Sequence, residues 1–287
     1  MPSQQDLRRR IRSVRSTQQL TRAMKMVYTA KLRRSQASVL DARPYAAALD
    51  GVLRSLAGRI GAGRHPLLVE RPEESVTLVV VAGDKGLCGA FNSNVLREAA
   101  ALLGGGRWKK VDLVLVGRRG IDFFRRRGLA AKAAYPELMK GVTVEGAHEV
   151  AHMLAGHFEK AETDAVYLLY NRFRSIMRQE VTLERLLPIE RTQPVASVAA
   201  VDYTLEPSPQ ALLAAILPRY VEFQVLRALL DSQAAEHAAR MTAMDSASKN
   251  AGEMIDRLTL TYNRARQASI TKELIEIVSG AQALAER

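Results

Sequence analysis

The chain has only one cysteine, Cys88, and this scarcity limits both its chemistry and its cellular setting. A single thiol excludes an internal disulfide and any zinc site built from several cysteines. Proteins without disulfides are typical of reducing compartments, so we expect a cytoplasmic protein. We expect Cys88 itself to be a small, buried or half-buried residue.

Aromatic residues are also scarce, at 5% of a sequence that is 47% hydrophobic. This composition fits helices packed through Ala, Leu and Met better than it fits a large globular core. No segment approaches the ~20 apolar residues of a membrane span, and the opening residues lack the apolar stretch of a signal peptide. We therefore expect a chain of one to two domains that is soluble on its own.

Acidic residues are outnumbered, with 30 Asp and Glu against 42 Lys and Arg, which gives a net charge of +12. Such an excess implies an acidic partner, which can be nucleic acid, an anionic membrane or an acidic protein surface. Basic clusters at Arg8–Arg15 and Lys31–Arg34 lack interleaved aromatic residues. These clusters suit acidic protein loops better than nucleic acid, although a nucleic-acid binder or an independent coiled-coil scaffold remains an alternative.

The last eighty residues have the hydrophobic period of a long helix. Ser208 and Pro209 form a start signal, and a helix from there to about Ala285 would be on the order of 115 Å long. Such a helix needs a partner helix. Its seam alternates in steps of three and four, as in a coiled coil, through Met241, Met244, Ser248, Ala251, Ile255, Leu258, Tyr262 and Ala265.

The partner is a second predicted helix over about residues 3–57. Its apolar seam starts at Leu7, is lost near Gln18 and returns in a set of later positions. The two terminal helices are expected to pair antiparallel, since one inserted domain separates them. The predicted seam residues are Leu7, Ile11, Val14, Leu20, Met24, Val27, Ala46, Leu49, Leu53 and Leu56.

Each long helix contains a proline, which removes one backbone hydrogen bond and costs roughly 3 kcal/mol. Pro44 predicts a bend or break beside Arg43. Pro218 predicts either a kink at Leu217 or a separate short helix from Pro209.

Between the helices, apolar runs alternate with helical patterns, which predicts a Rossmann-like α/β domain with a largely parallel sheet and an antiparallel edge of the last two strands. The expected division is a helix over 1–58, a linker over 59–74, the α/β domain over 75–190, a loop over 191–208 and a helix over 209–287. Strands are expected at 76–81, 111–116, 129–134, 166–170 and 180–188, and helices at 91–103, 120–127 and 146–160.

Two motifs within the inserted domain have a structural and a chemical interpretation. His148, Glu149 and His152 fit the H-E-x-x-H pattern of zinc hydrolases, but the longer form of that pattern fails and the residues favour two exposed histidines. The glycine-rich segment Gly83–Gly89 follows a strand, as a phosphate loop does, but it matches no phosphate-loop pattern and Asp84 would repel a phosphate. Glycines in a tight strand-to-helix turn are the favoured interpretation.

Several segments, in order along almost the whole chain, resemble the gamma subunits of F-type ATP synthases. The C-terminal run is a long and very specific match. The matching segments are Thr21–Val27, Ala42–Tyr45, Gly83–Asn92, Val116–Gly120, Asp202–Pro207 and Asn263–Ala281.

This resemblance implies a non-catalytic central shaft without a cofactor or metal, whose rotation couples proton flow to ATP synthesis. The implied partners are the alpha and beta subunits, the epsilon subunit and the membrane c-ring, which place the chain peripherally on the cytoplasmic face of the membrane. The implied beta-subunit contacts are Met24, Lys25, Lys85, Arg240, Arg266, Gln267 and Thr271. The implied contacts with the membrane ring and epsilon are Arg43, Tyr45, Tyr203 and Glu206.

The unpaired end of the last helix agrees with this picture. If the first helix pairs near Arg257 or Arg266, the apolar side chains beyond it need another protein to cover them. Polar contacts of a rotating shaft are expected to be few and exposed, because pairs worth ~0–1 kcal/mol can break at every step. The uncovered apolar positions are Leu274, Ile277, Val278, Ala281 and Leu284.

Overall fold

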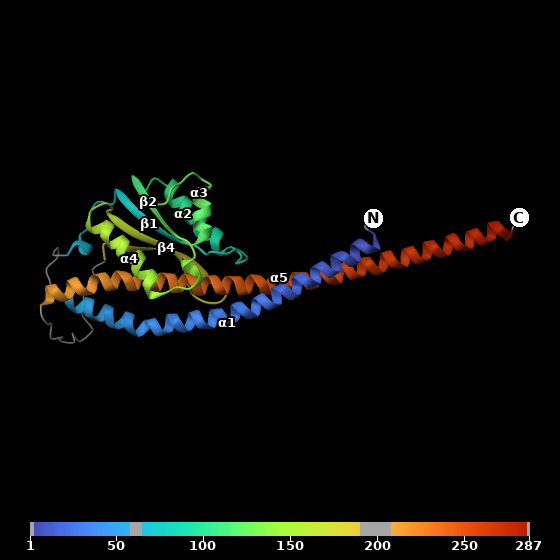
Figure 1. Cartoon of the computed structure of the whole chain (residues 1–287), viewed down its shortest axis with the longest axis horizontal. Coiled ribbons are helices and arrows are strands. Elements are labelled where there is room, and N and C mark those ends of the chain that lie inside the picture. Colours follow the sequence, from blue (N-terminus) through green and yellow to red (C-terminus); the bar gives the residue numbers. More distant parts are fainter. Residues whose placement is uncertain (1–2, 58–64, 190–207, 286–287) are drawn as a thin grey trace. The chain divides into compact units, whose positions relative to one another are not determined.

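The computed structural model describes residues 3–57, 65–189 and 208–285, and Figure 1 shows its elements coloured along the sequence. Two helices are very long, α1 (Gln4–Ala57) and α5 (Pro209–Ala285). The chain separates into two compact units, one of Met1–Val27 with Met241–Arg287 and the other of Tyr28–Arg240. Each long helix therefore contributes to both units.

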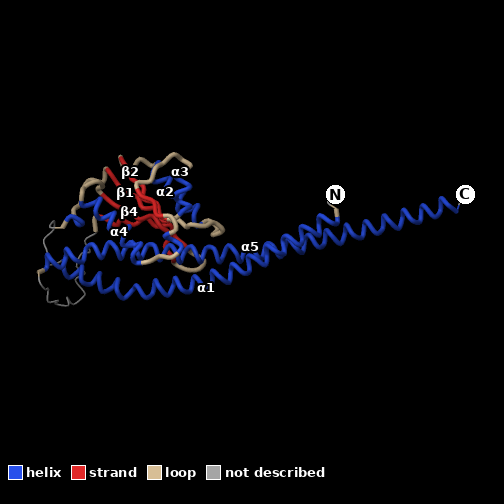
Figure 2. Tube along the Cα trace, viewed as in Figure 1, coloured by secondary structure: helices blue, strands red, loops and turns tan. Residues whose placement is uncertain are grey.

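A five-stranded sheet lies at the centre of the larger unit, in the strand order β3-β2-β1-β4-β5, and its strands are red in Figure 2. The strands β1, β2, β3 and β4 pair in parallel, whereas β5 runs antiparallel to β4. The predicted sheet, parallel with an antiparallel edge, is confirmed. The strands are β1 (Ser75–Val81), β2 (Lys110–Val116), β3 (Ala133–Tyr135), β4 (Ala165–Phe173) and β5 (Gln179–Leu187).

Helices cover both faces of this sheet, as a parallel sheet requires. Alternate residues of β1 point to opposite faces, so Leu78 packs with α2 (Phe91–Gly104) and α3 (Arg118–Arg125). Val79 instead packs with α4 (Val144–Glu159) and with the first part of α5, including Leu217. Short 3₁₀ helices at Pro66–Leu68 and Leu138–Lys140 complete the unit.

The region after β2 differs from the sequence prediction, because α3 starts two residues earlier than expected. Gly117, with φ 90°, turns the chain directly from β2 into α3, and a Cβ atom there would lie 2.0 Å from the carbonyl oxygen of Ala82. The following strand was predicted at 129–134 but includes only Ala133–Tyr135, and Leu129 is 43% exposed. The apolar residues before β3 thus belong to a surface segment.

In the smaller unit the two long helices pair antiparallel, as predicted. The Arg8 Nε donates to the Tyr262 hydroxyl at 2.7 Å, while Lys25, later in α1, lies 2.6 Å from Asp245, earlier in α5. The α5 seam residues from Met241 to Ala265 are all buried or half-buried, which confirms the C-terminal heptad pattern.

The middle of the α1 seam is polar, and this part of the prediction is wrong. Leu20 and Val27 were placed in the seam but are 62% and 52% exposed. Thr21 is buried instead, and the Gln18 amide donates to the Ser248 carbonyl oxygen at 3.3 Å. The interruption of the seam at Gln18 is therefore where a hydrogen bond between the two helices replaces apolar packing.

Both prolines lie inside unbroken helices, so neither a break beside Arg43 nor a separate short helix before Pro218 occurs. Each proline deprives the carbonyl four residues earlier of its N–H partner. Those residues, Leu40 and Ala214, are exposed, as are the prolines themselves, so water can bond the orphaned carbonyls. Around Pro218, buried Leu217 also anchors the helix to the sheet.

Candidate functional site

The glycine-rich loop between β1 and α2 is held in place by its own polar groups. The N–H of Gly83 donates to Asn92 Oδ1 at 2.8 Å, and a Cβ atom on Gly83 would lie 2.9 Å from Glu236 Oε1. Asp84 Oδ1 accepts the N–H groups of Arg118 and Glu137 at 2.9 and 3.0 Å. The carboxylate of Asp84 thus occupies the start of α3, where a bound anion would sit, which supports the tight-turn interpretation.

A buried ion pair on α5 clamps this loop. Arg240 and Glu236 lie 2.5 Å apart, with side chains only 3% and 6% exposed. Arg240 also donates to the carbonyl oxygens of Gly86 at 3.2 Å and Lys85 at 3.3 Å. Burial raises the pKa of Glu236, although Arg240 opposes that shift. The Arg240 guanidinium therefore fixes the loop to α5. Its removal would leave the buried Glu236 carboxylate unpaired, which is costly.

Two aromatic rings complete the surroundings of this ion pair. The Arg240 guanidinium lies 4.7 Å from the centroid of the Tyr28 ring, and the Tyr28 and His237 rings are 5.7 Å apart. Burial, with Lys31 and Arg240 nearby, lowers the pKa of His237 to about 4. His237 is therefore neutral near pH 7 and does not add a further positive charge beside Arg240.

The Arg240–Glu236 ion pair and its bonds to the loop, which we call the clamp, determine which loop side chains are exposed to a partner. Lys85 is exposed, and Leu87, at φ 63°, is 66% exposed. Cys88 is buried as predicted, and burial raises the pKa of its thiol. Arg240 was expected to be a partner contact like Lys85, but its side chain is buried and bonded within the chain. The spacing of Glu236 and Arg240 by four residues was the sequence signal for this pair.

Met24 and Lys25 lie on the paired helices of the smaller unit. Met24 is half-buried, and Lys25 is 45% exposed while it bonds Asp245 at 2.6 Å. Lys249 approaches the same carboxylate at 3.1 Å, and the hydrogen bonds from Lys25 and Lys249 lower the pKa of Asp245. The Lys25 side chain is thus paired with Asp245 and still partly open to solvent.

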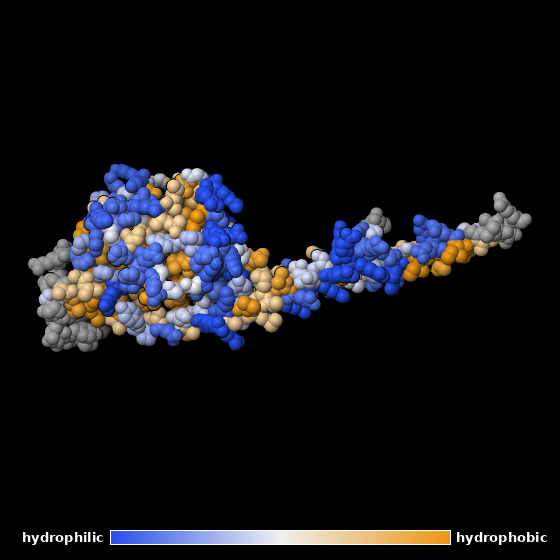
Figure 3. Space-filling view, viewed as in Figure 1, coloured by the Kyte–Doolittle hydropathy of each residue, from blue (hydrophilic) through white to orange (hydrophobic). Residues whose placement is uncertain are grey.

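The end of α5 carries the other predicted beta contacts. Arg266, Gln267 and Thr271 are all exposed, and the Thr271 hydroxyl donates to the Gln267 carbonyl oxygen at 2.9 Å. Beyond them lies an apolar tip, which is orange in Figure 3. As predicted, it stays uncovered, with exposures of 57% for Leu274, 60% for Ile275, 67% for Ile277 and 57% for Val278.

The four residues expected to meet the membrane ring and epsilon are only partly visible. Tyr45 on α1 is 49% exposed, and its ring centroid lies 5.3 Å from that of Phe223. The side chain of Arg43, and all of Tyr203 and Glu206, lie outside the described residues.

The histidine pair of the zinc-like motif is exposed on α4. His148 and His152 have ring centroids 5.9 Å apart, and His148 Nδ1 lies 3.0 Å from Glu222 Oε1. Glu149 is exposed as well, while the opposite face of the helix is buried. Among residues 3–57, 65–189 and 208–285, no three His, Cys, Asp or Glu side chains gather so that they could hold a metal ion.

Comparison with known proteins identifies the family. A family model described as ATP synthase matches residues 3–284. The ATP synthase gamma chain of Solibacter usitatus is 49% identical over 99% of both chains, and that of Pelotomaculum thermopropionicum is 47% identical over 99% of this chain and 100% of its own.

Solved structures agree with this result. A chain of the central stalk and c-ring of the Tetrahymena thermophila mitochondrial ATP synthase is 25% identical, with a TM-score of 0.62 over 80% of this chain and 99% of its own. A chain of the Euglena gracilis mitochondrial enzyme shares the fold, at 21% identity and a TM-score of 0.68 over 98% of this chain and 94% of its own. None of the described helices combines the length and the hydrophobicity that a membrane span requires. The chain therefore belongs to the family of ATP synthase gamma chains, the central-stalk subunits of F-type ATP synthases.

Proposed function

We propose that this chain turns as the non-catalytic central stalk of a proton-driven F-type ATP synthase. In this proposal the beta subunits make ATP, the alpha and beta subunits surround the paired helices, and the epsilon subunit and the membrane c-ring hold the other end. The chain then lies peripherally at the cytoplasmic face of the membrane. Membership of the gamma-chain family supports each of these assignments.

The uncovered apolar tip of α5 is the observation that carries the proposal. Four large apolar side chains within residues 274–278 are each more than half exposed. Burying one such side chain gains about 1.5–3 kcal/mol, so a protein collar around the tip is strongly favoured. Because hydrophobic contacts have no preferred direction, that collar can hold the helix while the helix turns.

Polar contacts of a turning shaft need the opposite property, which is to be weak and easily remade. Arg266, Gln267 and Thr271 are exposed and suit brief hydrogen bonds to acidic loops of a beta subunit. Lys85 is exposed and Lys25 is partly exposed, and both cations suit the same use. Met24 is half-buried beside Lys25, so a beta subunit would contact only the exposed part of its side chain.

Arg240 has a different role in this proposal. Its guanidinium bonds Glu236 and two loop carbonyls, so it acts on a beta subunit through the loop that carries Lys85. A force applied to Lys85 is then transmitted to α5 through Arg240, which bonds the loop carbonyls and is held by Glu236. At the other end, Arg43, Tyr45, Tyr203 and Glu206 would meet the membrane ring and epsilon.

Purification of the tagged chain from solubilised membranes of its own organism tests the proposal. We expect alpha and beta chains in stoichiometric amounts and ATP-driven proton pumping after reconstitution. Ile277→Asp with Val278→Asp should reduce the recovered alpha and beta chains, because two charges would enter an apolar collar. Met177→Asp is the matched control, since Met177 is 80% exposed on the β4–β5 loop.

The competing functions predict different companions in the same experiment. Recovery of the chain with nucleic acid would support a nucleic-acid binder, and bound zinc with hydrolytic activity would support the H-E-x-x-H interpretation. Either result without alpha and beta chains would contradict the stalk proposal. Equal recovery from the tip variant and wild type would contradict the collar.

A further inference from the structure

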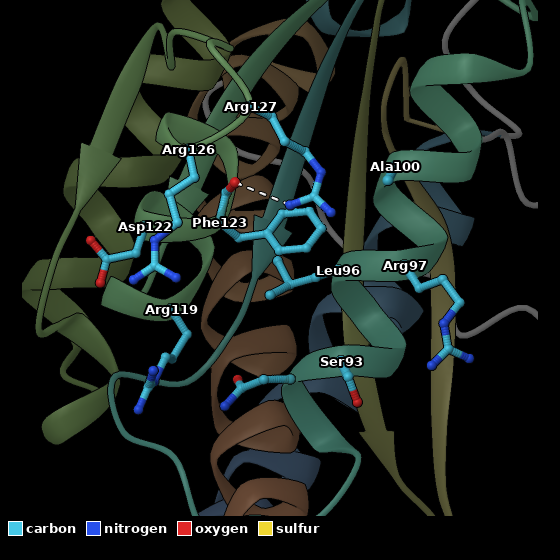
Figure 4. Close-up of a pocket in the computed structure, with 10 residues that line it drawn as sticks. Ser93, Leu96, Arg97, Ala100, Arg119, Asp122, Phe123, Arg126 and Arg127 are labelled. Atoms are coloured by element: carbon cyan, nitrogen blue, oxygen red, sulfur yellow. Dashed lines mark hydrogen bonds between the residues drawn. The ribbon is translucent and has the colours of Figure 1, made fainter.

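A groove of about 500 Å³ lies between α2 and α3, on the face of the sheet opposite α4. None of the roles proposed above uses it. Its volume lies within the range of pockets that hold small ligands. Figure 4 shows the side chains around it, of which Leu96, Arg97, Arg119, Phe123, Arg126 and Arg127 matter here.

Four arginines line the groove, Arg97, Arg119, Arg126 and Arg127. Asp122 also lines the groove but pairs with Arg125 at 2.7 Å, and the neighbouring Arg118 pairs with Glu137 at 2.8 Å. Arg97, Arg119 and Arg126 have no carboxylate within ion-pair distance among the described residues, and all three are exposed. Unpaired cations in a concave site raise the local potential, which an anion would relieve.

The guanidinium groups are partly held in position before any ligand arrives. Arg127 lies over the Phe123 ring at 3.6 Å and donates to the Phe123 carbonyl oxygen at 3.4 Å, drawn as a dashed line in Figure 4. The Arg119 guanidinium passes close to Gly86, where a Cβ atom would lie 2.9 Å from it. A stacked, planar guanidinium keeps free N–H edges that match two oxygens of a phosphate or carboxylate.

The wall opposite α3 adds two further features. Helix α2 begins at this groove without a side-chain cap at Ala90, so its N-terminal dipole favours an anion there. Buried Leu96 and half-buried Phe123 give the groove an apolar floor. The site therefore offers positive charge along its walls and a small apolar surface between them.

We propose that this groove binds a small oligophosphate, with Arg119, Arg126 and Arg127 holding the phosphate oxygens. The three arginines come from one short stretch of chain around α3, which suits a compact anion rather than an extended acidic segment. An inorganic oligophosphate would use the arginines alone. A nucleoside polyphosphate would also place its ring system against Leu96 and Phe123.

Binding is measured on the isolated full-length chain, because partner subunits that bind nucleotides would obscure the signal. A fluorescent dye on Ser93→Cys reports from the exposed edge of the groove, while the native Cys88 is buried and reacts little. The probes are tripolyphosphate and ATP without magnesium, together with a glutamate-rich peptide. The same dye on Ser38→Cys, an exposed site on α1, is the reference.

We expect both phosphate probes to change the signal at Ser93→Cys but not at Ser38→Cys. Arg119→Ala with Arg126→Ala should weaken their binding at least about tenfold, since two charged hydrogen-bonding groups are lost. Arg33→Ala with Arg34→Ala removes the same charge from α1 and should leave binding unchanged. Tighter binding of ATP than of tripolyphosphate identifies a nucleotide as the ligand, and equal binding identifies the phosphate chain alone.

Three results would overturn the proposal. These are no response to either phosphate probe at millimolar concentration, equal weakening by the Arg33 and Arg34 variant, and tighter binding of the glutamate-rich peptide than of both phosphates. Far-UV circular dichroism and thermal unfolding of each variant show whether it has folded. A misfolded double variant is replaced by the single variants Arg119→Lys and Arg126→Lys, which keep the charge and lose the planar fork. Unchanged binding in both lysine variants likewise overturns the assignment.

Discussion

Replacing Arg240 with methionine should destabilise the larger unit more than any other single arginine substitution on α5. Methionine keeps the apolar stem but leaves the Glu236 carboxylate, 6% exposed, without its partner. Breaking a buried pair in this way costs about 3–5 kcal/mol. Because the carbonyl of exposed Lys85 can be hydrated once its donor is lost, we expect about 3 kcal/mol at pH 7.

The pH dependence of this loss has a definite sign. Burial already raises the pKa of Glu236, and removal of Arg240 raises it further. The folded variant then holds this proton more tightly than the unfolded chain, so its stability falls as pH rises through the gap between the two pKa values. The deficit of Arg240→Met relative to wild type should therefore shrink on acidification from neutral pH.

Urea unfolding followed by far-UV circular dichroism measures the loss, and hydrogen exchange of amides 83–89 locates it. Arg219→Met is the matched control, since Arg219 is exposed on the same helix and should change stability by less than about 0.5 kcal/mol. The double variant Glu236→Gln with Arg240→Met removes both charges and should recover most of the stability. A loss below about 1 kcal/mol for Arg240→Met, or no recovery in the double variant, would refute the clamp.

Three further predictions test other parts of the chain. His237 has a pKa of about 4 in the folded chain and therefore binds its proton more weakly than in the unfolded chain. The free energy of unfolding should fall as the pH is lowered from about 6.5 to 4, by up to ~1.4 kcal/mol per pH unit. His237→Phe should reduce this pH dependence, as measured by urea unfolding at several pH values. Gly117→Ala should cost more than about 3 kcal/mol, because its Cβ would meet a carbonyl oxygen at 2.0 Å, whereas Gly104→Ala, with nothing within 4 Å, should be near neutral in the same assay. Arg266→Ala with Gln267→Ala should lower ATP synthesis in membranes while the helical content of the chain stays constant, and unchanged synthesis would contradict the proposed beta contact.

The sequence could predict those elements whose pattern repeats over several turns or strands. The α5 seam and the alternation of strands and helices were visible because each places apolar residues at a fixed period. Leu20 and Val27 were assigned to the seam for the same reason, and wrongly. At that level the Gln18 amide bonds the Ser248 carbonyl oxygen of α5 and the polar Thr21 is buried, so the period of the apolar residues no longer indicates the buried face.

Features made by tertiary packing were harder to foresee. The resemblance implied that Arg240 contacts a beta subunit, yet its guanidinium bonds Glu236 on the same helix and two carbonyl oxygens of the β1–α2 loop. The groove between α2 and α3 gave no sequence signal, because Arg97 and Arg126 are far apart in the chain and only the sheet brings their helices together. The spacing of Glu236 and Arg240 along α5 indicates their ion pair from the sequence, whereas the groove between α2 and α3 depends on the topology of the sheet.

The distribution of ion pairs across the two units fits the mechanics of a turning stalk. Lys25 and Asp245 form a partly exposed pair, with side chains 45% and 32% exposed, which solvent weakens so that it can exchange partners at little cost. Arg240 and Glu236 form a buried pair that is costly to separate, and they fix the loop carrying Lys85 to the long helix. Contacts that must break at each step would therefore lie at the surface, and contacts that carry force would lie inside. If the contacts with the surrounding subunits were buried ion pairs, they would be too costly to break at each step. If the loop carrying Lys85 were fixed to α5 only by an exposed pair, it would separate from the helix under load.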